Sequence, residues 1–419
     1  MTSCSWKLKL STVASISPVP GLADSQMNFP KDTKKLKVAI LAPDLSGGGG
    51  TRAYLLGQVL QKLNYDVKVF GFLFGKTLYP IPPDSLPVQW VPGGNYPQFF
   101  SLANKLLGEI EGDILYAVKP RSTSFGIALL KRLRTHQPVI LDIDDWELSW
   151  YGGGAWQYHL TPRQLARDLL KPEGALRHPE HPLYLQWMEK LVKRASAVTV
   201  DTQFLKNRFG GTYLPNGKDT ILFDPDRFKP EVSRASYGLS EYRVLLFPGT
   251  ARPHKGLEDV LMALDQLNQP DLRLVLVGGR DIGDGYVEQL LARWGRWVIK
   301  LPQSPMEKMP EIVSAGHVVV VPQRDTVTAQ AQFPIKLTDG MAMAKPILST
   351  RVGDIPEILA DTGYLVAPGA PEQIAEKIQW IFQNLEVANA QGRQARERCV
   401  AYYSIDAMGA ILSKIIERL

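Results

Sequence analysis

The sequence predicts an α/β protein of two tandem doubly wound (Rossmann-like) domains that face each other across a cleft. Strands that are apolar throughout alternate with helices, which is typical of a parallel sheet covered on both faces. The alternation begins at Leu36 and starts again at Arg243. The chain has 419 residues, more than the roughly 250 to 300 at which single cores stop growing. We therefore expect two domains.

The first series of elements has short aliphatic strands, and helices that carry apolar residues every three or four positions. Its strands are expected at Leu36–Pro43, Asp66–Phe72, Asp113–Val118, Pro138–Ile143 and Ala197–Thr202, with helices at Tyr54–Leu63, Ser101–Ile110 and Phe125–Arg134. The second series has strands at Arg243–Gly249, Leu272–Gly279 and Gly316–Pro322, and helices at Leu257–Leu267, Tyr286–Trp294 and about Phe333–Ala342.

Domain boundaries follow from where these patterns stop. Residues 1–35 are expected to be a flexible extension, and 36–222 the first domain with an insertion at about 146–190, where WELSWYGGGAWQYH interrupts the rhythm. Residues 223–399 are expected to form the second domain. The amphipathic end, 400–419, is expected to be a helix, with a position back on the first domain left open for it.

Composition excludes some classes and leaves others open. Hydrophobic residues make up 45% of the chain, and no apolar run approaches the roughly 20 residues that cross a bilayer. The two cysteines, Cys4 and Cys399, show no pairing or metal spacing, which indicates a reducing compartment. We expect a cytoplasmic protein, with the inner face of the membrane as an alternative. The net charge of +6 suits anionic ligands or an anionic membrane, but no nucleic-acid module is present, so no nucleic-acid partner is expected.

A glycine-rich loop follows the first strand. Gly48, Gly49 and Gly50 lie at the start of the first helix, where they let a ligand approach the backbone. The loop lacks the spaced glycines of a dinucleotide fingerprint and the Gly-Lys-Ser/Thr of a P-loop. Close approach of an acceptor is one interpretation, and a tight turn is the other.

A second loop, from Gly249 to Gly256, follows the first strand of the second domain. Arg252 and Lys255 stand at a helix start, where negative charge is preferred. An anionic ligand would offset that cost, whereas two solvated cations are the alternative.

A third segment, FPIKLTDGMAMA, completes the candidate donor site. Phe333 and Pro334 mark a helix start whose amide groups suit a phosphate. Lys336 adds a charge, and Asp339 could accept hydrogen bonds from sugar hydroxyls. A diphosphate next to a ribose would satisfy this set, and an ordinary pair of residues at a spacing of three is the alternative. The donor-binding candidates are Gly249, Thr250, Lys255, Phe333, Pro334, Ile335, Lys336 and Asp339.

These motifs resemble the retaining glycosyltransferases of family four, which have the GT-B architecture. LPNGKDTILFDP is similar to their "PNG-x-D…F-x-P" signature, TARPHKG to their phosphate loop, and the segment 333–359 to their "F-G…LEAMA-x-G-K-P-V…GG-x-P-E" pattern. The resemblance covers roughly residues 190–382. It implies that residues 223–399 bind the donor and that residues 36–222 are the acceptor side. It also implies that Lys255 holds the donor diphosphate and that Asp339 stands where a glutamate binds the ribose.

The sequence departs from the family pattern at four places. Asp339 is one methylene shorter than the ribose-binding glutamate, and the leading glutamate falls on Ala331, with Gln330 and Gln332 beside it. Thr250 occupies the usual arginine position, for which Arg252 is a substitute. Lys119 lies at about the place of a first-domain histidine.

An acidic run at the end of a strand in the first domain suggests a metal site, which is an alternative to the metal-free phosphate site of the second domain. The run DIDDWE contains Asp142, Asp144, Asp145 and Glu147, and an Asp-x-Asp pair can hold a divalent cation. We favour acceptor handling by Asp144 and Asp145, or a role of these residues in the structure of the loop, over a metal site. His178 and His181 are expected in a surface loop, since prolines flank them and no third ligand is evident. Basic residues with Trp150, Trp156 and Trp187 suit an anionic membrane or a polyanionic acceptor, or simply solvated helices.

The predicted function is that of a retaining, hexosyltransferase-type enzyme that moves a sugar from a nucleotide-diphosphate sugar to an acceptor hydroxyl of a polysaccharide, glycolipid or small glycoside. Lys255, Arg252 and Lys119 are the predicted catalytic cations. No cofactor is expected beyond the nucleotide-sugar co-substrate. The partners would be this donor, a carbohydrate or lipid-linked acceptor, and an anionic membrane surface. The alternatives are a non-catalytic nucleotide-sugar-binding or scaffold relative, and a metal-dependent transferase that uses the DIDD carboxylates.

Overall fold

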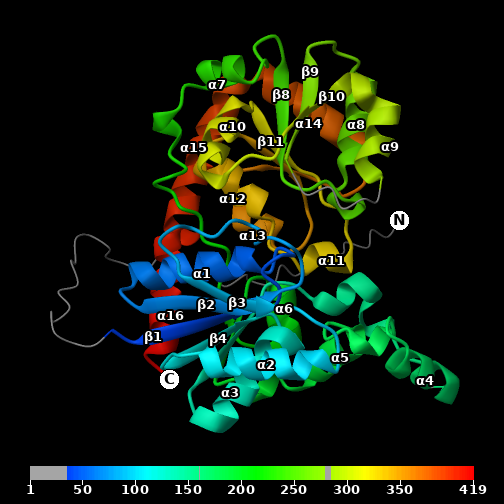
Figure 1. Ribbon diagram of the computed structural model, residues 1–419. Helices are drawn as coiled ribbons and strands as arrows, with labels where there is room; N and C mark the ends of the chain where they lie inside the picture. The colour runs from blue at the N-terminus through cyan, green and yellow to red at the C-terminus, as the bar shows by residue number, and fades with distance from the viewer. Residues whose placement is uncertain (1–34, 160, 279–284) are drawn as a thin grey trace, which may run out of the picture. The chain divides into compact units, whose positions relative to one another are not determined.

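The computed structural model describes residues 35–159, 161–278 and 285–419. The predicted N-terminal extension thus lies almost wholly outside the described residues, as does the end of the strand expected at Leu272–Gly279. Residues Leu36–Leu419 form one compact unit by their contacts. Two separate parallel sheets, each flanked by helices, make up this unit (Figure 1).

The first sheet has seven strands in the order β3-β2-β1-β4-β5-β6-β7, and all pairs are parallel. Strands β4 and β5 are buried along their whole length, and β1 is buried after its first residue, because helices cover both faces of the sheet. The strands are β1 Lys37–Ala42, β2 Asp66–Leu73, β3 Val88–Pro92, β4 Ile114–Val118, β5 Val139–Ile143, β6 Ala197–Val200 and β7 Thr212–Tyr213. The helices are α1 Gly50–Lys62, α2 Gln98–Glu109, α3 Ile127–Thr135, α4 Pro162–Leu170, α5 Pro182–Lys190 and α6 Gln203–Phe209.

The second sheet has six parallel strands in the order β10-β9-β8-β11-β12-β13. The strands are β8 Arg243–Pro248, β9 Leu272–Val277, β10 Val298–Leu301, β11 Val318–Val321, β12 Ile347–Thr350 and β13 Tyr364–Val366. The helices are α7 Pro230–Ser236, α8 Leu257–Leu267, α9 Tyr286–Trp294, α10 Met309–Ala315, α11 Val327–Gln330, α12 Ile335–Ala342, α13 Ile355–Leu359, α14 Pro371–Gln383, α15 Leu385–Tyr402 and α16 Ile405–Ile416.

Both sheets reverse their strand order next to the first strand, between β1 and β4 and between β8 and β11. In open sheets of this kind, ligands bind at the carboxyl ends of the strands beside that reversal. The glycine-rich loop follows β1, Lys119 follows β4, and the Arg252–Lys255 loop follows β8. The fold therefore places each of these predicted features at a binding edge.

The chain returns to the first sheet at its end. Helix α15 packs against α12, and α16 contacts α1 (Figure 1). Met408, Leu412 and Ile416 of α16 share a buried cluster with Val59 of α1 and Ile40 of β1. The last helix thus adds to the core of the first sheet.

The prediction of two doubly wound sheets is confirmed, whereas several peripheral elements were not anticipated. Strands β3, β7, β10 and β13, and helices α14 and α15, are absent from the predicted series. Strand β3 (VQWVP) lies at the sheet edge and exposes Trp90 and Pro92. Such a short, half-polar edge strand lacks the continuous apolar run that identifies a central one.

Candidate active site

The loop after β8 and the segment before α12 meet at one point. Gly249 has a φ of 120°, and a Cβ atom built there would lie 3.8 Å from Cε and 4.0 Å from Nζ of Lys336. Lys336 therefore reaches over the loop from the first turn of α12. Gly256 ends the loop with a φ of 67°, and a Cβ would come within 1.9 Å of the Pro322 carbonyl oxygen. Only glycine fits this crossing beside β11.

A glutamine side chain completes the junction. Nζ of Lys255 donates to Oε1 of Gln332 at 3.0 Å, and Nε2 of Gln332 donates to Oδ2 of Asp145 at 3.1 Å. Asp145 lies in the loop after β5 of the first sheet, so the chain Lys255–Gln332–Asp145 connects the two halves of the molecule. Sequence reasoning had placed Gln332 only beside the missing glutamate.

An aromatic side chain covers the same region. Trp150, in the single helical turn Glu147–Tyr151, donates its indole N–H to Oδ2 of Asp145 at 2.9 Å. The guanidinium carbon of Arg252 lies 5.0 Å from the Trp150 ring centre, within cation–π range. The His254 ring lies 5.5 Å away, edge to face. Trp150, for which the sequence suggested a membrane, a polyanionic acceptor or a solvated helix, thus belongs to this site.

Burial and mutual repulsion disfavour the charged forms of the basic groups at this site. Burial lowers the pKa of Lys255 well below its ordinary value, and Lys336 and Arg252 lower it further, although Asp145 opposes them. Burial also lowers the pKa of Lys336 to about 8 despite Asp339, and that of His254 to about 3, with help from Lys255 and Arg252. A bound anion would favour the charged forms of all three.

Asp339 has a partner that the sequence analysis did not identify. Its carboxylate forms an ion pair with Lys218, whose ammonium also lies 4.4 Å from the ring centre of Phe223. Both charged side chains are about nine-tenths buried. Lys218 directly follows the Asn-Gly of the predicted signature, which is the only signal that could have marked it. The ribose-binding role of Asp339 stays a prediction.

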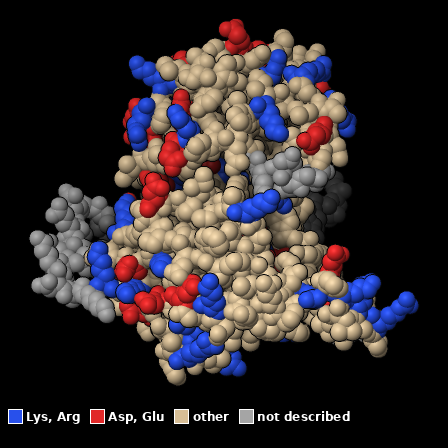
Figure 2. All heavy atoms as spheres, viewed as in Figure 1, with Lys and Arg blue, Asp and Glu red and all other residues tan. Residues whose placement is uncertain are grey.

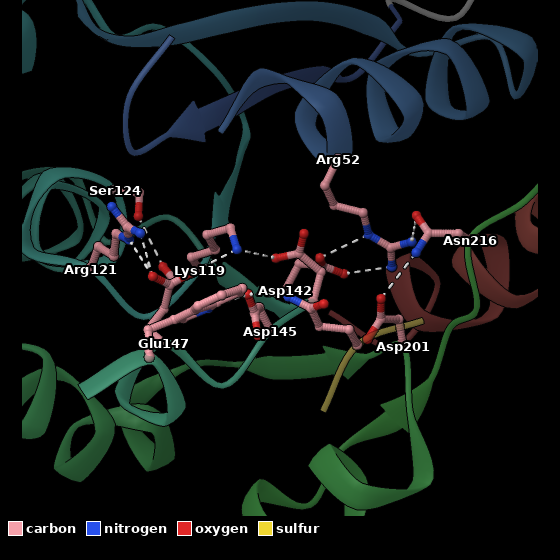
Figure 3. Close-up of polar contacts among 12 residues, drawn as sticks. Arg52, Lys119, Arg121, Ser124, Asp142, Asp145, Glu147, Asp201 and Asn216 are labelled. Carbon is pink, nitrogen blue, oxygen red and sulfur yellow. Dashed lines mark hydrogen bonds and ion pairs between the residues drawn. The ribbon is translucent and has the colours of Figure 1, made fainter. Parts of the chain in front are cut away.

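Lys119 is engaged by carboxylates in a second cluster (Figure 3). Its ammonium lies 2.7 Å from Oε1 of Glu147 and 3.3 Å from Oδ1 of Asp144. Arg121 also pairs with Glu147. Burial opposes ionisation of Glu147, but Arg121 and Lys119 outweigh it and lower its pKa to about 2. The predicted catalytic role of Lys119 therefore competes with a structural one.

Asp142 belongs to a third, fully buried network that sequence reasoning missed. Nε and Nη2 of Arg52 each lie 2.9 Å from an oxygen of Asp142, in a bidentate pair. Arg52 also donates to Oδ1 of Asn216 at 3.0 Å, and Asn216 donates to Asp201 at 3.0 Å (Figure 3). The metal-dependent alternative needs Asp142 and Asp144, and ion pairs already engage both.

The glycine-rich loop leaves one position open. Gly48 has a φ of 88°, and a Cβ there would meet no atom of the described residues within 4 Å. At Gly49 a Cβ would come within 2.5 Å of the Asp44 carbonyl oxygen, so glycine is needed for the turn itself. The tight-turn interpretation therefore holds for Gly49, whereas Gly48 has open space beside it. Its role towards an acceptor stays a prediction.

The insertion at about 146–190 folds into α4, α5 and short turns. Nδ1 of His178 accepts from the Glu180 amide, and Nδ1 of His181 accepts from the Leu183 amide, so both histidines shape the loop. Leu169 and Leu170 on α4 are 49% and 79% exposed. Basic side chains gather over α4 in Figure 2, and the exposed ones there are Arg163, Arg167 and Lys171. Among the described residues, no helix has the length and apolar character to span a bilayer.

Comparison with solved structures defines the class of fold. Anabaena HepE, solved in complex with UDP-glucose, superposes with a TM-score of 0.69 over 92% of this chain and 100% of that chain, at 17% identity. This likeness shows the GT-B fold, as the two parallel sheets and their strand order indicate.

Sequence comparison relates the second half of the chain to known enzymes. Residues 242–384 match the family model of the glycosyl transferases, group 1. An alpha-maltose-1-phosphate synthase of Mycolicibacterium smegmatis is 27% identical over 248 residues, which are 52% of this chain and 62% of that protein. A sulfoquinovosyl transferase of Arabidopsis thaliana is 24% identical over 327 residues, 73% of this chain and 57% of that protein. The matches thus span less than two thirds of these two relatives.

Proposed function

We propose that the chain is a retaining glycosyltransferase that moves a sugar from a nucleotide-diphosphate sugar to an acceptor hydroxyl. The observation that carries the proposal is the convergence of Lys255, Lys336 and Arg252 beside the loop after β8. Lys255 and Lys336 are buried and have lowered pKa values, as expected of cations in a diphosphate site before the anion binds. The family match over 242–384 supports a nucleotide-sugar donor on this half.

The chemistry that this arrangement supports is electrostatic. The bond between the anomeric carbon and the outer phosphate oxygen breaks, and the acceptor oxygen forms the new bond on the same face of the sugar. The acceptor proton passes to the departing phosphate oxygen. Lys255, Lys336 and Arg252 stabilise the charge that develops on the diphosphate. No covalent carboxylate intermediate is required.

The acceptor side belongs to the first half in this proposal. The open face of Gly48 and the side chain of Asp144 lie at the carboxyl ends of β1 and β5. The acceptor would be a carbohydrate or a lipid-linked carbohydrate. Exposed Leu169 and Leu170 beside basic residues of α4 support a peripheral contact with an anionic membrane, at the inner face of the cytoplasmic membrane.

Thermal shift with a panel of nucleotides tests donor binding. UDP, GDP and ADP, and their glucose and mannose esters, are added to the purified chain, and a ligand that binds raises the melting temperature. A slow release of free sugar from the stabilising ester then identifies an enzyme. Stabilisation without any sugar release would favour the non-catalytic relative, for which the buried Ala331 at the position of the leading glutamate is the motivating observation. A panel without any stabilising member would contradict the proposed function.

A further inference from the structure

The amide of Gln332 has a fixed orientation. Its oxygen accepts from the Lys255 ammonium, which can only donate, and its nitrogen donates to the Asp145 carboxylate, which accepts. The reverse orientation would place like groups against each other. Gln332 is therefore the single side chain that bridges Lys255 and Asp145.

Asp145 has a hydrogen-bonding capacity that the described residues do not use. It is 7% exposed, and its Oδ2 accepts from both Gln332 and Trp150. Its Oδ1 is buried and has no hydrogen-bond partner among the described residues. A buried carboxylate oxygen without a donor costs free energy. A ligand hydroxyl placed there would supply the missing donor.

The covalent structure of the proposed donor determines what can lie at this place. The diphosphate is bonded to the nucleoside on one side and to the sugar on the other. Gln332, Lys336 and Asp339 follow one another along the chain, and Asp339 is the predicted ribose side. The transferred sugar is bonded to the outer phosphate, and Gln332 and Asp145 lie within one side chain of Lys255, which is predicted to hold that diphosphate. Ala331 is fully buried and apolar, so it cannot bind a hydroxyl.

We propose that Asp145 and Gln332 together form the subsite for the transferred sugar, with a sugar hydroxyl bound between Oδ1 of Asp145 and the Gln332 amide. This inference rests on the proposed function. Both halves of the molecule would then contact the donor sugar, because the carboxylate comes from the loop after β5 and the amide from the segment before α12. It also assigns Asp145 to the donor, whereas the sequence placed it on the acceptor side.

Calorimetric titration with two probes tests the subsite. The probes are the nucleoside diphosphate that stabilises the wild type in the UDP, GDP and ADP panel, and its sugar ester. Asp145→Ala should weaken binding of the sugar ester about tenfold or more, which corresponds to loss of a hydrogen bond to a charged group. Binding of the plain diphosphate should stay within about twofold. Gln332→Ala should act in the same direction, and Glu173→Ala, on the exposed insertion, should change neither.

The outcomes separate the two proposals. If the wild type binds both probes but Asp145→Ala weakens them equally, or weakens neither, the subsite is wrong and the proposed function stands. If Asp145→Ala changes only the KM for the acceptor, Asp145 belongs to the acceptor side. If the wild type binds no panel member, the proposed function is contradicted, and the subsite with it. Should Asp145→Ala fail to fold, as judged by its melting temperature, Asp145→Asn and Gln332→Ala decide on the same criteria.

Discussion

The ammonium of Lys255 lies 3.0 Å from Oε1 of Gln332, which joins the loop after β8 to the segment before α12. These segments are 77 residues apart in sequence. Their contact places one cation of the phosphate loop beside the entrance to α12, where Lys336 supplies another. The lysine and aspartate that share one face of α12 therefore have different surroundings: Lys336 faces the loop at Gly249, and Asp339 is paired with Lys218.

Nucleoside diphosphate binding should weaken as the pH rises. The pKa of Lys336 is lowered to about 8 in the free protein, chiefly by burial. A bound diphosphate favours the charged lysine, so binding above pH 8 must take up a proton, whereas below pH 8 the proton is already present. We expect about a tenfold loss of affinity between pH 7 and pH 9. Lys255, whose pKa is also lowered, adds to the change in the same direction.

The Lys336→Arg variant is the matched control for this pH dependence. Arginine keeps its charge over the whole range, so its affinity should change less between pH 7 and pH 9. Calorimetry at constant ionic strength measures both proteins. An affinity for the wild type that is equal at the two pH values would contradict the assignment of a diphosphate to this lysine.

Removal of Arg52 should destabilise the protein without acting on the donor site directly. The change Arg52→Ala leaves the fully buried Asp142 carboxylate without its bidentate partner. Loss of one partner of a buried pair costs about 3 to 5 kcal/mol. Urea unfolding should show this loss, whereas Arg163→Ala, an exposed arginine of α4, should stay within about 0.5 kcal/mol of the wild type. Equal stabilities of the two variants would show that the network contributes nothing.

Lys119→Ala decides between a structural and a catalytic role for that residue. The variant leaves Asp144 and Glu147 without their shared cation, although Arg121 still pairs with Glu147. We expect a loss of about 3 kcal/mol in the free energy of unfolding, with the Kd for the nucleoside diphosphate unchanged. A variant with wild-type stability and strongly reduced kcat would instead make Lys119 a catalytic residue, as the sequence analysis predicts.

The sequence could predict the fold because the central strands carry their own signal. Runs such as VAILA in β1 and VVVV in β11 are apolar on both faces, and only a doubly covered parallel sheet buries such strands. The edge strands β3 (VQWVP) and β10 (VIKL) contain polar or exposed residues and so lack a continuous apolar run. Their detection depends on tertiary contacts that no local pattern contains.

The site was predictable where a residue acts through its own local context and not where it acts through a distant partner. Lys255 and Lys336 stand out because cations at helix starts oppose the helix dipole. The partners Arg52 and Asp142 are separated by 90 residues, and Gln332 and Asp145 by 187. Nothing in the sequence near any of these four residues indicates the partner. The role of Gln332 became visible only when the two loops were placed together.

The most direct test of the account is the effect of Lys255→Ala on binding of the nucleoside diphosphate and on turnover. We expect the Lys255→Ala variant to fold, because the loss of Lys255 removes its repulsion with Lys336 and Arg252. Its affinity for the diphosphate and its rate of sugar release should each fall at least about tenfold, since one charge-assisted contact to the diphosphate is lost. A folded Lys255→Ala protein that binds the diphosphate and releases sugar as the wild type does would contradict the convergence of cations on one diphosphate.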